Sequence, residues 1–323
     1  MTATGEWVFG IDGGGTSSRI RAESLSGTLL YQGSAGSTNL NASDARSVKE
    51  VLRLLVSDAL ASGLAPADCR SGFIGSAGVD LEQDRQTMAR ALADAFHGAA
   101  SRVRPAADQR LAAPAFAAGN DAEPALVGAL GELEGFLLIA GTGSIALGRA
   151  LSGEQVRAGG WGHFLGDEGS AFWIAFEAIK RGIRASEGRD VQTTLLESAL
   201  QHFGLPDAQS LIPFTYANFN KASIASFAPR VAGSAAAGDV LACDIMEHAV
   251  KELATLAVSV FDTLGKRMGS PKLSLYGGLL EKNAWLNTQV AARICAARPA
   301  LAIVEPRGDA QSGACRLARA LLA

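Results

Sequence analysis

The chain of 323 residues is 48% hydrophobic and 19% charged, which is sufficient for two globular domains with their own cores. Its net charge of -3 argues against nucleic acid or an anionic membrane as the main partner. The four cysteines lie far apart, so we expect neither a zinc site nor a disulfide framework and infer a cytoplasmic protein. Residues 1–7 contain no basic residue and no apolar stretch approaches ~20 residues, so we expect no signal peptide and no membrane span.

The first half of the chain begins with apolar runs separated by glycine turns, which predict consecutive strands followed by an amphipathic helix that Gly63 ends. The expected elements are, in chain order, strands at 7–11, 18–24 and 28–33, a helix at 44–62, a strand at 72–76, a helix at 81–96, a short strand near 101–104 and a helical stretch near 107–118. The predicted order of elements is therefore β-β-β-α-β-α-β-α.

The second half repeats this order. The expected elements are strands at 136–140, 144–150 and 154–158, helices at 168–185 and 190–203, a long helix at 239–267, a strand at 272–276, a helix at 282–297, a strand at 301–304 and a helix at 309–322. The region 204–237 is rich in Ala, Gly, Pro and Ser, and we expect an insertion of helices and loops without chemistry of its own. The pattern predicts an α/β protein made of two similar halves.

A glycine-rich segment joins the first two predicted strands. Glycine reaches positive φ without a Cβ penalty and leaves its amide uncovered, so such a turn approaches a bulky anion closely. The predicted phosphate ligands are Asp12, Gly13, Gly14, Gly15, Thr16 and Ser17. Asp12 is placed to hold a cation beside the phosphates. The alternative is an ordinary β-hairpin turn with an incidental acid.

A second segment, Gly141, Thr142 and Gly143, follows the same plan between two apolar runs. Neither segment is a Walker motif, because no lysine follows the glycines and a strand is expected where that motif requires a helix. We therefore predict two hairpins, one from each half, that grip the phosphate tail of a nucleotide across a cleft.

Two β-β-β-α-β-α-β-α halves with paired phosphate hairpins describe the actin-like ATPase fold, in which each domain is ribonuclease H-like. The chain resembles the N-acetylglucosamine kinase branch of the BadF/BadG/BcrA/BcrD ATPase family, which includes bacterial glucosamine kinases. The segments that carry the resemblance are 12–16, 37–39, 120–122, 140–144, 277–278 and, as the most specific, 159–170. The resemblance implies one domain at 1–119 that is completed by a returning helix at 308–323, and another at 120–307.

The resemblance favours Asp121 as the catalytic base. Phosphorylation of a sugar hydroxyl needs a carboxylate within hydrogen-bond reach of it. On sequence alone, Asp121 could equally cap the helix that begins before Pro124. Asp12 is expected to hold Mg²⁺ through water, and an Asx turn is its alternative. ATP and Mg²⁺ are thus the implied cofactors.

The resemblance also implies contacts to the nucleoside and to the sugar. The nucleoside contacts are expected from Gly277 and Gly278, and the sugar contacts from Asn39, Asn120, Gly160, Trp161 and Asp167. An apolar ring beside acids suits a sugar, whose faces are partly CH and whose rim is hydroxyl. The alternatives are plain turns for the glycine pair and Asn39, and a core position for Trp161. We expect His163 to bond to the backbone rather than act as a base.

The function that these residues predict is an ATP-dependent kinase acting on the C6 hydroxyl of glucosamine or N-acetylglucosamine. The resemblance implies that residues 75–80 lie near the amino group of the sugar, where they offer groups suited to either sugar. Among these two sugars we slightly favour glucosamine. A homodimer is common in the family. One alternative is an iron–sulfur ATPase activator of a radical acyl-CoA dehydratase, which the dispersed cysteines disfavour. The other is a non-catalytic sugar-binding regulator, which Asp121 and the two hairpins disfavour.

Overall fold

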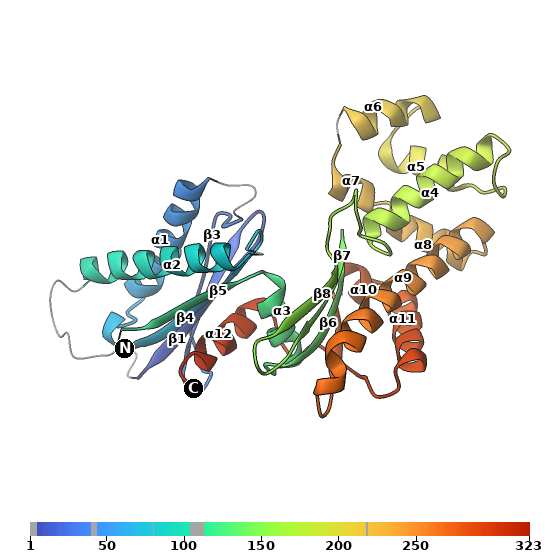
Figure 1. The fold of residues 1–323 in the computed structure, drawn as a ribbon. Coiled ribbons are helices and arrows are strands. Elements are labelled where there is room, and N and C mark those ends of the chain that lie inside the picture. The colour runs from blue at the N-terminus through green and yellow to red at the C-terminus, as the bar shows by residue number, and fades with distance from the viewer. Residues whose placement is uncertain (1–4, 40–43, 80, 104–112, 218) are drawn as a thin grey trace. The chain divides into compact units, whose positions relative to one another are not determined.

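The computed structural model describes residues 5–39, 44–79, 81–103, 113–217 and 219–323. It divides into two compact units (Figure 1). The first unit comprises Met1–Glu134 and Pro306–Ala323, and the second comprises Gly135–Glu305. Each unit contains one sheet with helices packed on it.

The first unit has a five-stranded mixed sheet in the order β3-β2-β1-β4-β5. Its elements are β1 (Trp7–Gly13), β2 (Ser18–Ser24), β3 (Leu29–Ala35), α1 (Ala45–Ala61), β4 (Cys69–Ser76), α2 (Glu82–Val103), β5 (Ala115–Gly119), α3 (Ala122–Leu130) and α12 (Ala310–Ala320). The first three strands pair antiparallel, whereas β1, β4 and β5 pair in parallel.

Both faces of the central strand β1 are covered by helices. Phe9 and Ile11 belong to a buried cluster with Leu52 of α1 and Leu92 of α2. Gly10 faces the other way, since successive strand residues point to opposite faces, and a Cβ there would overlap the backbone of α12. The near-continuous burial of β1 follows from this coverage on two sides.

Helices α3 and α12 approach each other backbone to backbone. A Cβ on Gly128 would overlap the carbonyl of Asp309, and a Cβ on Gly313 would overlap that of Pro124. The first unit therefore extends to Glu134, past the expected boundary at residue 119, because α3 packs on α12 within it.

Substitution of Gly313 tests this contact. We expect Gly313→Ala to lower the free energy of unfolding by about 1–3 kcal/mol, because the methyl group meets rigid backbone rather than a flexible side chain. Gly98→Ala in α2 is the matched control, since a Cβ at that position would have no atom of the described residues within 4 Å. The control should be neutral or slightly stabilising. Denaturant unfolding measures both, and a Gly313→Ala variant as stable as the control would contradict the argument.

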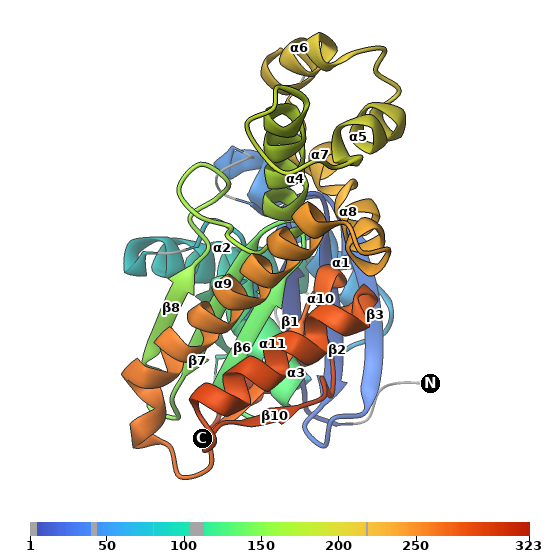
Figure 2. The same cartoon turned by 90° about the vertical axis from the view of Figure 1, so that its right-hand side faces the viewer.

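The second unit repeats the topology, with sheet order β10-β9-β6-β7-β8. Its elements are β6 (Gly135–Ala140), β7 (Ser144–Arg149), β8 (Gln155–Gly159), α4 (Ala171–Ser186), α5 (Leu195–Phe203), α6 (Leu211–Tyr216), α7 (Lys221–Ala225), α8 (Ala228–Ala236), α9 (Val240–Leu264), β9 (Lys272–Tyr276), α10 (Gly278–Lys282), α11 (Ala284–Ala297) and β10 (Ala302–Val304). Helix α9 lies along the face formed by β6, β7 and β8 (Figure 2). The predicted duplication and α/β fold class are confirmed.

The strand expected near 101–104 and the helical stretch expected near 107–118 are wrong. Helix α2 continues to Val103, and β5 occupies Ala115–Gly119; residues 104–112 lie outside the described part of the chain. The alanines of β5 favour a helix in isolation. Parallel pairing of β5 with the buried strand β4 overrides that preference. The tertiary environment of a segment determines whether it forms a strand more strongly than its intrinsic propensity does.

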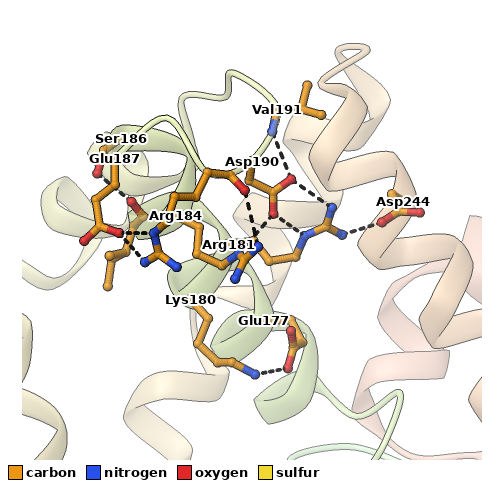
Figure 3. A network of polar contacts seen from close by, with 11 residues as sticks. Glu177, Lys180, Arg181, Arg184, Ser186, Glu187, Asp190, Val191 and Asp244 are labelled. Carbon is orange, nitrogen blue, oxygen red and sulfur yellow. Dashed lines mark hydrogen bonds and ion pairs between the residues drawn. The ribbon is translucent and has the colours of Figure 1, made fainter.

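Ion pairs fasten one end of α4 in the second unit (Figure 3). Arg181 pairs with Asp190 at 3.1 Å and also with Asp244 at the start of α9. Hydrogen bonds from Arg181 and from the Val191 amide hold the pKa of the Asp190 carboxyl below its ordinary value. Arg181 therefore joins α4 both to α9 and to the loop that follows α4.

Asp190→Asn should lower the free energy of unfolding at about pH 7 and make it less dependent on pH in the acidic range. A carboxyl whose pKa is lowered by folding stabilises the native state above the unfolded pKa of ~3.9, and that contribution is lost as pH falls through the folded pKa. The control is Glu187→Gln, which removes an exposed partner of Arg189. Denaturant midpoints measured from about pH 7 down to about pH 3 should converge for wild type and Asp190→Asn. Parallel curves would contradict this role.

Candidate active site

The first predicted phosphate segment forms the turn of a β-hairpin at the end of β1 and β2. The strands pair in register from Trp7 opposite Ser24 to Gly13 opposite Ser18. The amide of Gly14 donates to the carbonyl of Ser17 at 3.1 Å and closes the turn. The expected ligands at its tip, Gly15, Thr16 and Ser17, are exposed, so their amides and hydroxyls lie at the surface.

Three buried hydroxyls lie directly beneath this hairpin. The Thr38 hydroxyl lies 2.9 Å from that of Ser18 and 3.1 Å from that of Ser76, which itself donates to the Thr38 carbonyl at 2.9 Å. A Cβ on Gly13 would overlap Oγ1 of Thr38. This set of hydroxyls, here called the hydroxyl cluster, joins the hairpin to the end of β4. No sequence motif predicts this cluster, because its small polar residues lie far apart in the chain.

Gly13→Ala tests whether the hydroxyl cluster sets the position of the hairpin. The added methyl should displace the Thr38 hydroxyl and leave buried polar groups without partners, at a cost of about 1–3 kcal/mol in the free energy of unfolding. Gly15→Ala is the control, because its methyl would meet Asn39 at an ordinary 3.8 Å. Chemical denaturation compares the two variants. An equal free energy of unfolding for the two variants would mean that the hydroxyl cluster does not exclude a side chain at position 13.

Asp12 lies on β1 directly opposite Arg19 on β2, and their side chains pair at 2.7 Å. Mg²⁺ in phosphate sites commonly takes one or two carboxylates together with waters and phosphate oxygens. A single partly exposed carboxylate beside the hairpin fits this mode. Among the residues that the structure describes, no group of three or more His, Cys, Asp or Glu residues is arranged to hold a metal without a substrate.

Asn39 is tied to the same hairpin. The backbone amide of Asn39 donates to the Ser37 hydroxyl at 3.1 Å, and that hydroxyl donates to the Gly14 carbonyl at 3.1 Å. The predicted sugar contact therefore lies beside the predicted phosphate loop. The side chain of Asn39 also lies close to the turn, since a Cβ on Gly15 would lie 3.8 Å from its Nδ2.

Asn120 and Asp121 stand between the end of β5 and the start of α3. The side-chain oxygen of Asn120 accepts a hydrogen bond from the Glu123 amide at 2.9 Å, so Asn120 caps the helix. Within the described part of α3, the Asp121 carboxylate makes no capping hydrogen bond, and its side chain is exposed. The capping alternative for Asp121 is therefore wrong. The amide nitrogen of Asn120 and the second acceptor position of its oxygen remain for the predicted sugar contact.

The second predicted phosphate segment forms a matching hairpin between β6 and β7. The Gly141 amide donates to the Gly143 carbonyl at 2.9 Å, and the Ala171 amide at the start of α4 donates to the Gly141 carbonyl at 2.9 Å. The Ser144 hydroxyl donates to the carbonyl of Glu168 at 2.8 Å. This hairpin is thus fastened to the loop and helix that follow β8.

Asp167 lies against the second hairpin, and both of its oxygens are engaged. Oδ1 accepts from the Ser144 amide at 3.1 Å, and Oδ2 lies 2.6 Å from Nζ of Lys221. Its φ of 65° is the only positive value among the described non-glycine residues. A carboxylate has about four acceptor positions, so these contacts leave capacity for the predicted sugar hydroxyl.

Trp161 and His163 occupy the glycine-rich loop before α4. Trp161 is 61% exposed and stacks under the Arg157 guanidinium at 4.4 Å, so the core alternative for Trp161 is wrong. The exposed ring, next to Gly160 in the chain, is available to shape a pocket. The His163 ring packs against Phe164 and Phe219. Its Nε2 is buried without a hydrogen-bond partner among the described residues, so this nitrogen does not make the backbone bond expected of His163.

A cavity of about 620 Å³ opens beside the second hairpin, within the usual size range of small-molecule pockets. Gly141 and Thr142 of the hairpin and Gly278 of α10 line it together. Gly277 packs closely behind, since a Cβ there would lie 2.6 Å from the Ala140 carbonyl. The other lining residues include Ala222, Ala225, Pro229, Met246, Lys282 and Asn283. The region 204–237, to which no chemistry was assigned, therefore supplies part of this wall.

Comparison with known proteins gives one consistent result. The model of the BadF/BadG/BcrA/BcrD ATPase family matches residues 9–318. A Clostridium acetobutylicum protein named N-acetylmuramic acid/N-acetylglucosamine kinase is 30% identical over 97% of this chain and 98% of its own. A Vibrio cholerae protein named glucosamine kinase is 27% identical over 95% of this chain and 94% of its own.

Solved structures agree on the fold. A candidate N-acetylglucosamine kinase from Chromobacterium violaceum has a TM-score of 0.67 and 25% identity, covering 97% of this chain and 99% of its own. A ROK family glucokinase from Streptomyces griseus, solved with glucose and AMPPNP, has a TM-score of 0.51 and 16% identity over 97% of this chain and 99% of its own. The second likeness shows the fold alone.

Proposed function

Because the chain belongs to the BadF/BadG/BcrA/BcrD ATPase family, we propose that it is an ATP-dependent kinase of an amino sugar, glucosamine or N-acetylglucosamine. The observation that carries the proposal is Asp121. It is an exposed carboxylate in the same unit as the first hairpin, and the helix beside it is capped by Asn120 instead. Relatives that match nearly the full length are named as kinases of amino sugars, which supports the substrate class.

In this proposal Asp121 orients the C6 hydroxyl and accepts its proton as that oxygen attacks the γ-phosphorus. The new O–P bond forms while the bond to the bridging oxygen of ADP breaks, and solvent later removes the proton from Asp121. Amides and hydroxyls of the two hairpins stabilise the charge on the phosphate oxygens. The ligands are Gly13, Gly14, Gly15, Thr16 and Ser17 from one hairpin and Gly141, Thr142 and Gly143 from the other. Mg²⁺ on Asp12 would neutralise phosphate charge.

The remaining assigned residues bind the two substrates. Gly277 and Gly278 contact the nucleoside in the cavity of the second unit, whose apolar lining suits a purine ring. The sugar contacts are Asn39, Asn120, Gly160, Trp161 and Asp167.

The kinase works in the cytoplasm as a homodimer, with an amino sugar as its partner rather than nucleic acid or a membrane. Among the described residues, no helix has the length and apolar character needed to cross a lipid bilayer.

The cysteines do not favour an iron–sulfur activator. Thiolates are the ligands of such clusters. Cys69 and Cys315 are buried, and burial raises the pKa of both thiols. Cys243 and Cys295 lie on α9 and α11 of the second unit. The set therefore provides only two accessible thiols, on separate helices.

Asp121→Asn should lower kcat by about 10²–10⁴-fold, because the amide cannot accept the hydroxyl proton. The fold should be retained, since the Asp121 side chain is exposed and asparagine is equally well accommodated at the start of a helix. Asp94→Asn, an exposed position on α2, is the matched control and should keep wild-type activity. ADP release is measured with glucosamine and N-acetylglucosamine in parallel, which also identifies the preferred sugar. Turnover of Asp121→Asn within about threefold of wild type would refute its assignment as the base.

A further inference from the structure

Lys221, the first residue of α7, reaches the second hairpin from a distant part of the chain. We propose that Lys221 is a ligand of the nucleotide phosphates, positioned by Asp167 against the Gly141–Gly143 turn. The inference rests on the proposed function, because it concerns the same nucleotide site. It gives the helical segment 204–237 a chemical role that sequence analysis did not assign.

The distances place the lysine ammonium at the tip of the hairpin. Nζ lies 2.6 Å from Oδ2 of Asp167, whose other oxygen accepts from the Ser144 amide at 3.1 Å. A Cβ built on Gly143 would lie 3.1 Å from Nζ of Lys221 and 2.6 Å from Oδ1 of Asp167. The space beside Gly143 that a side chain would fill is therefore occupied by the ion pair. Any side chain at Gly143 would push the ion pair away from the turn.

Burial within the ion pair is unequal. The Asp167 side chain is only 4% exposed, whereas that of Lys221 is 29% exposed. Aspartate thus acts as the fixed partner, and the lysine keeps an accessible side. An ammonium has three N–H donors, and the geometry uses one of them on Asp167. The others suit phosphate oxygens, for which lysine acts as a point charge.

The backbone of Asp167 is in an uncommon conformation. Its φ of 65° is the left-handed conformation, which asparagine and aspartate both adopt more readily than other side chains. The conformation alone does not require a charged residue. The ion pair with Lys221 does use the charge, so a carboxylate at this position is explained by the cation that it orients.

The cavity shows where the rest of the nucleotide would lie. Ala222, Ala225 and Ser226, which follow Lys221 on and just after α7, line the same cavity as Gly141 and Thr142. Among the described residues that line it, Lys282 is the only charged one. A nucleoside in this largely apolar cavity directs its phosphates towards the hairpin, where Lys221 stands. Neither hairpin is followed by a lysine of its own, so Lys221 supplies the charge that other phosphate loops take from an adjacent lysine.

The rival interpretation is that Lys221 only holds Asp167 for the sugar. Calorimetric titration with ATP and with adenosine, without sugar, separates the two. Lys221→Met should weaken ATP binding by about 10–100-fold and leave adenosine binding unchanged, with partial recovery in Lys221→Arg. Lys180→Met, which removes an exposed ion pair on α4, is the control. Unchanged ATP affinity together with a raised KM for the sugar would overturn the proposal.

A second experiment uses the wild-type protein and so does not depend on how a variant folds. An amine-acetylating reagent is applied with and without ATP, and modification of each lysine is measured by mass spectrometry. ATP should protect Lys221 and adenosine should not, while Lys180 reacts equally throughout. Equal labelling of Lys221 in all conditions would overturn the proposal. A wild-type protein that phosphorylates no amino sugar but shows this protection would refute the kinase assignment alone.

Discussion

Close packing of a glycine on a polar side chain governs both hairpins. Gly13 lies where a Cβ would overlap the hydroxyl of Thr38, and Gly143 lies where a Cβ would approach Oδ1 of Asp167 to 2.6 Å. In each unit the missing side chain lets a buried polar group touch the strand end and set the course of the turn. The course of each hairpin turn therefore depends on the tertiary packing beneath it as much as on the glycines that form it.

The two hairpins nevertheless carry different electrostatics. The first rests on the neutral hydroxyl cluster, and its charged groups, Asp12 and Arg19, lie on neighbouring strands. The second rests on an ion pair whose lysine remains partly exposed. The surroundings of the two turns therefore differ: the first unit presents a carboxylate paired with a guanidinium, and the second presents a partly exposed ammonium paired with a buried carboxylate.

Local pattern accounts for most of what sequence could predict. Glycines between apolar runs identified the hairpins, and their repetition identified the duplicated sheets, because both signals lie within short segments. The contact between Asp167 and Lys221 joins residues far apart in the chain, so no pattern could indicate it. Asn120 and Asp121 are both good capping residues, and only the structure shows which one caps α3. The alanine-rich β5 was mistaken for a helix because its strand pairing is tertiary.

The return of α12 to the first sheet affects the order in which the protein can form during synthesis. Strand β1 leaves the ribosome early, yet the helix that covers Gly10 and packs on α3 ends only at Ala320. The segment Gly135–Glu305 emerges in between as a complete unit, and it can fold before the first unit has received α12. Until α12 is synthesised, one face of the first sheet lacks its covering helix, and exposed apolar surface of this kind is prone to aggregate.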